Sequence, residues 1–375
     1  MSGGDGMPRT LGGENMKVAD MHCDTIYEIL RKKEQGQAIS LRSNEGHVDL
    51  LRMKRGQYLI QNFALFVELG RDGDPWERVC ALFRCYQEEM EQNRDMIAPV
   101  LRFTDIAENE AAGKMSAMLT VEEGAVCGGD LDKLHALYRM GVRMITLTWN
   151  YENEIGFPNF LPKLRQEMKT AREHWKSCEP GNPEEEEKRQ AAQAAFDAYF
   201  HTPNRTAGLT EKGKELVAEM ERLGMIPDVS HLSDGGFYDV LEVTSKPFVA
   251  SHSNARAVSP SVRNLTDDMI RRLSERGGVT GLNFCADFLE ERPIGQENPG
   301  TIEAVVRHAK HIVSVGGIEV LGLGSDFDGI GTHGELPGAE SMGRLWEALH
   351  GAGFTEGALD KVFCENVLRV YRDTL

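Results

Sequence analysis

Short apolar segments alternate along the chain with segments whose apolar residues recur at helical spacing. Eight of the apolar segments resemble strands, and several lack strict polar alternation, which is typical of parallel strands buried on both faces. They span residues 18–24, 59–67, 116–122, 144–149, 225–231, 247–252, 278–284 and 320–326. This order favours an α/β fold of the (β/α)8, TIM-barrel type over an open doubly wound sheet.

Two segments depart from this alternation. Residues 1–15 are polar and Gly-rich, and we predict that they form a flexible leader. Residues 160–205 contain a Pro-Gly-Asn-Pro turn and a Glu-rich run before an Ala-rich segment of helical character. We interpret them as a helical insertion after the fourth strand, on the active-site side of the barrel. Residues 16–375 then form a single catalytic domain, a length that such barrels reach with insertions.

The composition excludes several classes of partner. The chain has 42 Lys and Arg against 59 Asp and Glu, a net charge of −17, and nucleic-acid binding needs clustered basic side chains. No segment reaches the roughly 18 apolar residues of a membrane span, and no apolar signal segment opens the chain. We therefore expect no nucleic-acid or membrane partner and a cytoplasmic location. The seven cysteines include no CxxC pair, which argues against a disulfide framework or a thiolate zinc site.

Residue types that bind metal ions fall at the ends of predicted strands. The C-terminal ends of barrel strands form the active-site face, so their side chains converge on one mouth. A single histidine there is more often structural, but six such residues together are hard to produce by accident. Imidazoles and carboxylates suit zinc, and these can hold two ions about 3.5–4 Å apart that share a carboxylate. The six are His22, Asp24, Glu122, His231, His252 and Asp326.

The other histidines that we considered lack this position. His308 and His311 lie on the helix predicted between the seventh and eighth strands, where we expect a solvated helix face. His47 and His135 have no strand-end position, and we interpret both as structural residues.

The segments that carry these residues resemble the membrane (renal) dipeptidase family of zinc dipeptidases, within the amidohydrolase superfamily. The resemblance runs through MHCDT, HVDLLRMKRG, TVEEG, PDVSHLS, SHSNARAVSPSVRNLTDD, GLGSDFDG and ENVLRVY. It covers nearly the whole chain apart from the leader and residues 160–205. The SH…RN block and GSDFDG are specific in combination, whereas the HxD pattern by itself is not.

The resemblance implies a barrel with two zinc ions as cofactors. By position, His22 and Asp24 would hold the first ion. Glu122 would bridge the two ions, and His231 and His252 would hold the second.

The resemblance also assigns the remaining site residues. Arg263, in SVRNL, matches the arginine that receives the substrate carboxylate, a task that suits a planar fork of five donors. Asp326 matches the aspartate beside the metal-bound water, with Asp328 ranked second. Successive strand residues point to opposite faces, so only one of Glu122 and Glu123 can face the ions, and the family's VEGG-like segment selects Glu122.

One position departs from the family. Its members commonly carry a histidine after the fourth strand, in a TLTH-like segment, that contacts the substrate or the developing oxyanion. The corresponding segment here is TLTWN, with Trp149 at that position and Asn150 next. We expect Asn150 to donate a hydrogen bond to the substrate oxygen and Trp149 to wall the pocket against bulky side chains.

These observations lead to the hypothesis of a zinc-dependent dipeptidase. A metal-bridging hydroxide would attack the scissile carbonyl of a dipeptide, Asp326 would move the proton, and Arg263 would read the free carboxylate. Other amidohydrolase reactions, on lactones, cyclic amides or N-acyl amino acids, would use the same metal residues. A metal-binding protein without turnover is the alternative from another class, and only Trp149 supports it. A homodimer is compatible with the sequence, which leaves the oligomeric state open.

Overall fold

Parallel strands form a closed ring in the computed structural model, which describes residues 16–178, 182 and 185–375. Around the ring the order is β2, β1, β9, β8, β7, β6, β5 and β4, and β4 closes it by pairing with β2. A ninth strand, β3, pairs beside the start of β4. The strands are β1 (Val18–Asp20), β2 (Tyr58–Phe66), β3 (Ile97–Pro99), β4 (Met115–Glu122), β5 (Val142–Thr146), β6 (Ile226–Asp228), β7 (Val249–Ala250), β8 (Val279–Leu282) and β9 (Leu321–Leu323).

The predicted (β/α)8 barrel is confirmed, and each of the eight predicted strand segments overlaps one strand of the ring. Several strands end earlier than predicted: β1 ends at Asp20 and β6 at Asp228. The residues that follow these strands therefore belong to loops at the barrel mouth. The sequence pattern does not predict β3. This strand has only three residues, of which the first is buried, the second half-buried and the third exposed, so it forms no apolar run.

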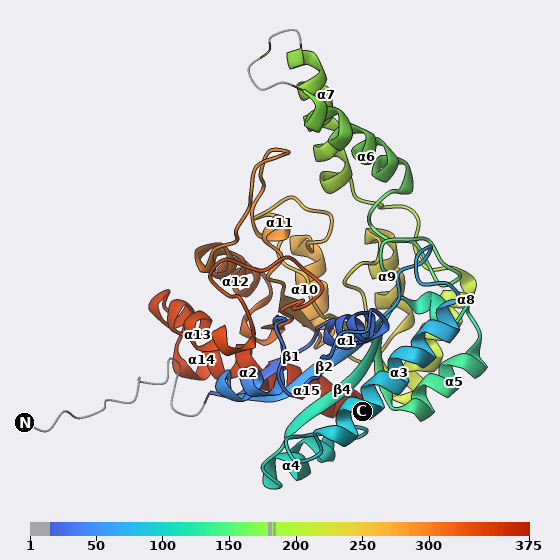
Figure 1. Cartoon of the computed structure of the whole chain (residues 1–375), viewed down its shortest axis with the longest axis vertical. Coiled ribbons are helices and arrows are strands. Elements are labelled where there is room, and N and C mark those ends of the chain that lie inside the picture. The colour runs from blue at the N-terminus through green and yellow to red at the C-terminus, as the bar shows by residue number, and fades with distance from the viewer. Residues whose placement is uncertain (1–15, 179–181, 183–184) are drawn as a thin grey trace, which may run out of the picture.

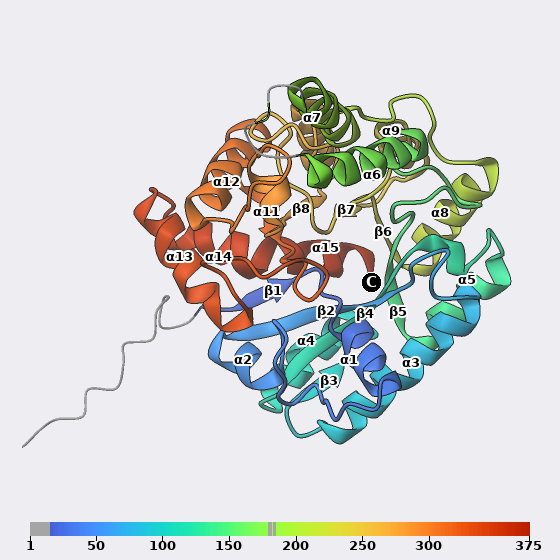
Figure 2. The ribbon, with the colours of Figure 1, turned by 45° about the horizontal axis from the view of Figure 1, so that its top comes forward.

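Helices surround the ring of strands (Figures 1 and 2). Several begin where an Asp, Ser or Thr side chain accepts a hydrogen bond from the first turn, as Asp49, Ser233 and Thr301 do. The helices are α1 (Thr25–Glu34), α2 (Leu50–Arg55), α3 (Pro75–Gln92), α4 (Phe103–Ala111), α5 (Leu131–Met140), α6 (Pro162–Ser177), α7 (Glu186–His201), α8 (Glu211–Leu223), α9 (Asp234–Val243), α10 (Asp267–Glu275), α11 (Ala286–Leu289), α12 (Ile302–Gly316), α13 (Met342–Gly351), α14 (Glu356–Asp360) and α15 (Asn366–Thr374).

The barrel is buried on both faces of its strands, and all nine residues of β2 are buried. This explains why the strand segments read as continuous apolar runs. Helix α15 covers the end of the barrel where the strands begin. Its Val367 and Val370 pack in one cluster with Met118, and the Tyr371 hydroxyl donates to Asn62 Oδ1 at 2.9 Å. Polar side chains gather at the opposite end, where the strands end.

Residues 160–205, which we call the arm, contain the helices predicted for the insertion. Helices α6 and α7 pack against each other and project away from the barrel (Figure 1). In the view of Figure 2 they lie over one side of the barrel rim. The predicted leader, residues 1–15, lies outside the described residues.

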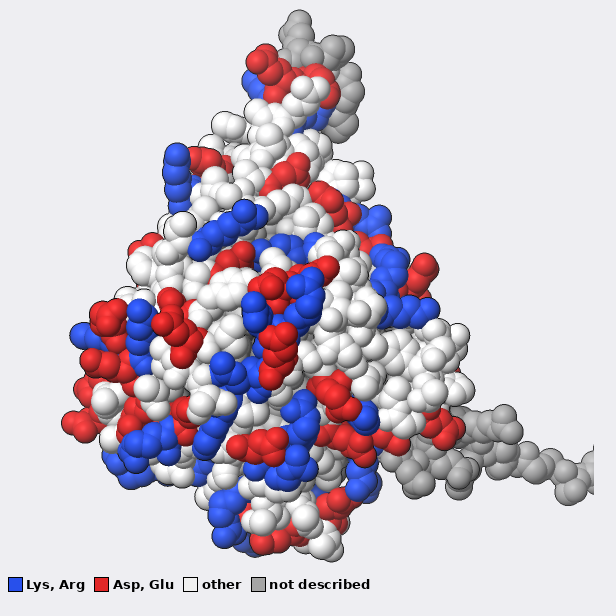
Figure 3. Space-filling model, turned by 180° about the vertical axis from the view of Figure 1, so that it is seen from behind, with Lys and Arg blue, Asp and Glu red and all other residues white. Residues whose placement is uncertain are grey.

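The described part of the chain has free cysteines and, on the face drawn in Figure 3, a surface of mixed charge. None of its helices combines the length and apolar character that crossing a bilayer requires. All seven cysteines are free. On the face seen in Figure 3, acidic and basic side chains are interspersed. The cytoplasmic location stays a prediction.

Candidate active site

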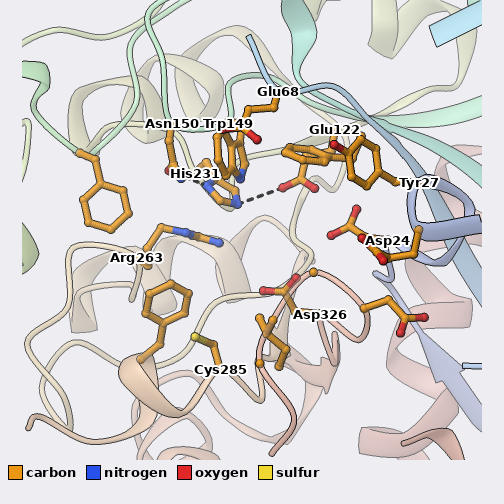
Figure 4. A pocket seen from close by; sticks show the side chains of 18 of the residues that line it. Asp24, Tyr27, Glu68, Glu122, Trp149, Asn150, His231, Arg263, Cys285 and Asp326 are labelled. Carbon is orange, nitrogen blue, oxygen red and sulfur yellow. Dashed lines mark hydrogen bonds and ion pairs between the residues drawn. The ribbon is translucent and has the colours of Figure 1, made fainter. Parts of the chain in front are cut away.

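The six candidate ligands lie together at the C-terminal mouth of the barrel, and all are buried. The ring brings the ends of its parallel strands to one face, so residues far apart in the chain meet there. Figure 4 shows Asp24, Glu122, His231 and Asp326 around one cavity. In chain order the six are His22 and Asp24 after β1, Glu122 at the end of β4, His231 after β6, His252 after β7 and Asp326 after β9.

The Glu122 carboxylate lies at the centre of the cluster. Its Oε2 atom is 3.2 Å from His22 Nε2, and its Oε1 atom is 3.0 Å from His231 Nε2 and 3.6 Å from His252 Nε2. Asp24 Oδ2 lies 3.7 Å from His22 Nε2 on the other side. One carboxylate thus faces two groups of ligand atoms, one around His22 and Asp24 and one around the two other histidines.

Several buried polar atoms in the cluster have no hydrogen-bond partner. His22 Nε2 and Asp24 Oδ1 are both buried and make no hydrogen bond, although His22 Nε2 lies within ion-pair distance of Glu122. The Nε2 atoms of His231 and His252 lie 3.0 Å apart. Buried polar atoms without partners are costly, and a divalent cation would satisfy all of these at once. The donor set of imidazoles and carboxylates therefore fits zinc or a similar ion.

The electrostatics of the cluster keep two of its histidines neutral and draw a positive charge toward the acids. Burial opposes protonation of His22, but the Glu122 and Asp24 carboxylates outweigh it and raise its pKa well above the usual range. The same burial raises the pKa of Glu122. Burial also lowers the pKa of His231 and His252 well below the usual range, helped by the charges of Arg263 and His22. Two neutral imidazoles beside carboxylates are what a cation requires of its ligands.

Hydrogen bonds fix the tautomers of these two neutral histidines. His231 Nδ1 lies 3.0 Å from the carbonyl oxygen of the Asn150 side chain, which can only accept, so Nδ1 carries the proton. His252 Nδ1 lies 2.7 Å from Ser251 Oγ, whose own proton goes to Asp228 Oδ2 at 2.6 Å. Ser251 Oγ therefore accepts from His252. In both rings the Nε2 lone pair is left facing Glu122.

Asp228, at the end of β6, anchors this arrangement from beneath. Its carboxylate accepts five hydrogen bonds from the backbone N–H and hydroxyl groups of Ser230 and Ser251 and from the Thr146 hydroxyl. Ser230 Oγ in turn accepts from the backbone N–H of His252 at 3.1 Å. Sequence reasoning missed Asp228, although its place three residues before a candidate ligand was a usable signal.

The adjacent acid Glu123 turns away from the cluster. Its side chain accepts from the backbone N–H groups of Ala125, at 2.9 Å, and Trp149, at 3.1 Å, and from the Asn153 amide. Its backbone has φ of +101°, which breaks the strand directly after Glu122. Burial raises the pKa of Glu123 to about 7, against the pull of these donors. Of the two acids, Glu122 is the one that the structure brings to the other candidate ligands.

The two candidate acids after β9 differ in their contacts. Asp326 Oδ2 accepts from Asn283 Nδ2 at 2.9 Å, and its Oδ1 lies 3.9 Å from His22 Nε2. Burial raises the pKa of Asp326 to about 6. Asp328 is held instead by the Thr25 hydroxyl at 2.6 Å and the His47 N–H at 2.7 Å. His47 thus organises the loop, and Asp326 is the acid that faces the cluster.

Arg263 lies fully buried beside the same cavity. One guanidinium nitrogen, Nη2, lies 3.4 Å from the His252 carbonyl oxygen, but Nε and Nη1 have no partner. The Phe288 ring lies under the guanidinium at 5.3 Å. Burial lowers the pKa of Arg263, although Asp326 and Glu122 oppose the shift. Its free donors are therefore available to a ligand in the cavity.

The cavity has a volume of about 460 Å³ and an aromatic lining that sequence reasoning missed. Phe66 ends β2, so its strand-end position was a signal that could have found it. The others come from helices and loops whose place over the mouth has no local sequence signature. The missed lining residues include Tyr27, Phe66, Glu68, Phe160, Cys285 and Phe288.

Trp149 and Asn150 both line the cavity. The Trp149 ring packs edge-on against Phe66 at 5.0 Å, which makes it part of the wall. The Asn150 side-chain oxygen accepts from His231, and its backbone oxygen accepts from Arg165 at 2.8 Å. Asn150 therefore positions a histidine of the cluster, and its predicted donation to the substrate stays a prediction.

The remaining histidines lie outside the cluster, but the expected solvated face was wrong for His308. That ring is fully buried, with Nδ1 accepting from the Ala255 N–H at 3.1 Å and Nε2 at 2.9 Å from the Leu289 carbonyl. It connects α12 to the loop after β7 and to the end of α11. His311 is half-buried and binds Asp267 at 2.7 Å, and His135 binds Glu219.

A (β/α)8 barrel whose mouth carries a buried cluster of histidines and acids beside an unpaired arginine is the architecture of a metal-dependent hydrolase. The model of the membrane dipeptidase family (peptidase family M19) matches residues 13–163 and 185–374. The chain belongs to this family and is a hydrolase of the peptidase class. The match leaves out residues 164–184, which lie within the arm.

Individual relatives agree with the family. An uncharacterized dipeptidase of Schizosaccharomyces pombe is 30% identical over 96% of this chain and 81% of its own length. Among solved structures, a dipeptidase of family M19 has a TM-score of 0.79 at 28% identity, covering 96% of this chain and 99% of its own. A Rhodobacter sphaeroides metallopeptidase, solved with a phosphinate mimic of L-Ala-D-Ala, has a TM-score of 0.78 at 28% identity, covering 96% and 100%.

Gly329 must remain glycine for the cluster to keep its shape. A Cβ atom there would overlap Asp24 Oδ2 and lie 2.7 Å from Asp326 Oδ1, whereas one at Gly331 would meet nothing within 4 Å. We expect Gly329→Ala to lower kcat for a dipeptide about 10²-fold, the scale of a small misplacement in an active site. Gly331→Ala is the matched control. Equal activity of the two variants would refute this role.

Ser251 should matter for metal affinity because it accepts the proton of His252. We expect Ser251→Ala to weaken zinc binding about 10- to 100-fold, as loss of an orienting partner does. The measurement is competition with a chromophoric chelator. Ser253→Ala, on the other side of His252, is the control because Ser253 Oγ makes only a long, 3.4 Å bond to the Ser230 carbonyl. Unchanged affinity in Ser251→Ala would show that the tautomer needs no such support.

Proposed function

We propose that the protein is a zinc-dependent dipeptidase that reads the free carboxylate of its substrate through Arg263. The supporting observation is the buried guanidinium, which has two unpaired nitrogens and borders the same cavity as the cluster. A buried guanidinium with unpaired N–H donors is stabilised by an anion. Its planar arrangement of donors matches the two oxygens of a carboxylate. A carboxylate one residue from the scissile bond distinguishes a dipeptide from a protein chain.

The proposed ligands follow the two groups of atoms around Glu122. His22 and Asp24 would hold one ion, His231 and His252 the other, and Glu122 both. Two such ions, with zinc suited to the imidazoles, would polarise the scissile carbonyl and activate a water. The two oxygens of Glu122, each nearest a different histidine, support the bridging role.

Asp326 is the proposed proton carrier. Asn283 anchors its Oδ2, so Oδ1 is the oxygen left toward the cluster and the cavity. A carboxylate held in this way can take a proton from the attacking water and give it to the leaving amine. Because Asn283 donates to only one oxygen, the other stays free for this exchange.

The two ends of the cavity give the substrate a direction. Figure 4 shows Arg263 and Cys285 on one side of the cluster and Tyr27 and Asp24 on the other. With the carboxylate at Arg263, the N-terminal residue of a dipeptide lies toward Tyr27 and the wall of Trp149. The L-Ala-D-Ala mimic in the Rhodobacter neighbour supports testing substrates with a C-terminal residue of either chirality.

Replacement of Arg263 tests the proposal. We expect Arg263→Met to lower kcat/KM for Ala-Ala by a factor that corresponds to about 2–4 kcal/mol, because a charge-assisted bidentate contact is lost. The parent enzyme should already cleave C-terminally amidated Ala-Ala poorly. Amidation of the substrate should not raise the kcat/KM of the variant. Arg71→Met is the control, since Arg71 lines the same cavity but is already paired with Glu68. Equal cleavage of free and amidated substrate by the parent would contradict the proposal.

A further inference from the structure

The base of the arm forms part of the cavity wall. Phe160, which precedes α6, lines the cavity, and its ring stacks on Tyr199 of α7 with centroids 4.5 Å apart and planes at 11°. Phe200 meets the same ring edge-on at 5.8 Å. Phe160, Met168, Tyr199 and Val262 form a buried cluster separate from the two barrel cores. The position of Phe160 is therefore set by the arm.

The same base holds the loop that carries Arg263. The backbone N–H of Val262 donates to the Phe200 carbonyl at 2.7 Å, and the Val262 carbonyl accepts from Asn159 Nδ2 at 2.8 Å. The backbone N–H and carbonyl of the residue before Arg263 are thus bound by Phe200 of the arm and by Asn159, the residue directly before the arm. Phe160 and the guanidinium are consequently fixed relative to each other.

This end of the cavity differs in chemistry from the other. The lining residues related to Arg263 are Phe288, whose ring lies under the guanidinium, Cys285, whose thiol interacts electrostatically with it, and Phe160, which packs in one cluster with the preceding Val262. The cysteine pKa is raised by burial, so the thiol stays neutral. The charged lining residues other than the cluster and Arg263 come from α1 and from the loops after β2 and β9, namely Glu28, Glu68, Arg71 and Asp328.

We propose that the base of the arm builds the subsite for the C-terminal side chain of the substrate, and that Phe160 selects apolar and aromatic side chains there. The inference rests on the proposed function, because Arg263 must hold the carboxylate for the adjoining side chain to reach Phe160 and Phe288. An aromatic or aliphatic side chain buries apolar surface between these rings. A charged one loses water there, and the charged group among the lining residues related to Arg263 is the guanidinium itself, which the substrate carboxylate would occupy. The arm, which the family match covers only in part, thereby acquires a role in specificity.

The test is a panel of Ala-Xaa dipeptides with Gly, Leu, Phe, Asp and Lys at the second position. For the parent we expect kcat/KM to be highest with Phe and Leu and lowest with Asp and Lys. Phe160→Ala should reduce the preference for Ala-Phe over Ala-Gly about tenfold or more, the scale of apolar contacts in specificity pockets. Ala-Gly itself should change only a few-fold, and the zinc content should be that of the parent.

Two further variants make the test decisive. Phe160→Leu keeps apolar bulk, and its preference for Ala-Phe over Ala-Gly should fall between those of the parent and Phe160→Ala. This variant still tests the subsite should the alanine variant fold poorly. Phe196→Ala removes a ring from the same helix as Tyr199, one that packs on Phe200 at 4.7 Å without lining the cavity, and should leave the preference unchanged.

Each contrary result has a distinct meaning. A parent that cleaves dipeptides with no preference at the second residue, or a Phe160→Ala variant that shifts no more than Phe196→Ala, overturns the subsite and leaves the proposed function intact. A parent that cleaves none of the dipeptides overturns the proposed function and the subsite with it.

Discussion

The burial of Glu122 among three histidines and two further acids is the constraint on which the rest of the structure depends. Taking such groups out of water is unfavourable unless something pairs them, and among the described residues the positive charges near these acids are those of His22, whose pKa they raise, and of the more distant Arg263. Under the proposed function, a pair of divalent ions would resolve this conflict. The barrel supplies rigid strand ends so that the ligands are held close together before any ion arrives.

Neighbouring residues fix the orientation of the side chains in this cluster. Asn150 holds one histidine and Ser251, backed by Asp228, holds another, so both present the same ring nitrogen to Glu122. Gly329 gives Asp24 and Asp326 room on the other side. Arg263 lies beyond the cluster with unpaired donors, at a point that the arm fixes through Val262. Under the proposed function, the catalytic groups and the substrate-binding arginine would thus lie on separate elements that share one cavity.

The sequence could predict the barrel and the positions of the six candidate ligands because both follow from local patterns. A buried strand reads as an apolar run, and a polar residue at its end stands out against it. The roles of Asp228 and Asn150 could not be predicted in this way, because they depend on which hydroxyl or ring nitrogen a neighbouring strand brings near. The burial of His308 likewise depends on how α12 packs, and Phe160 reaches the cavity only through the fold of the arm.

The most direct measurement is a crystal structure of the protein loaded with Zn²⁺, with anomalous scattering recorded at the zinc absorption edge. The account predicts two peaks about 3.5–4 Å apart with the Glu122 carboxylate between them. His22 and Asp24 should contact one peak, and His231 and His252 the other. The absence of any peak at this cluster, or a single ion that leaves one histidine group unbound under zinc-replete conditions, would contradict it.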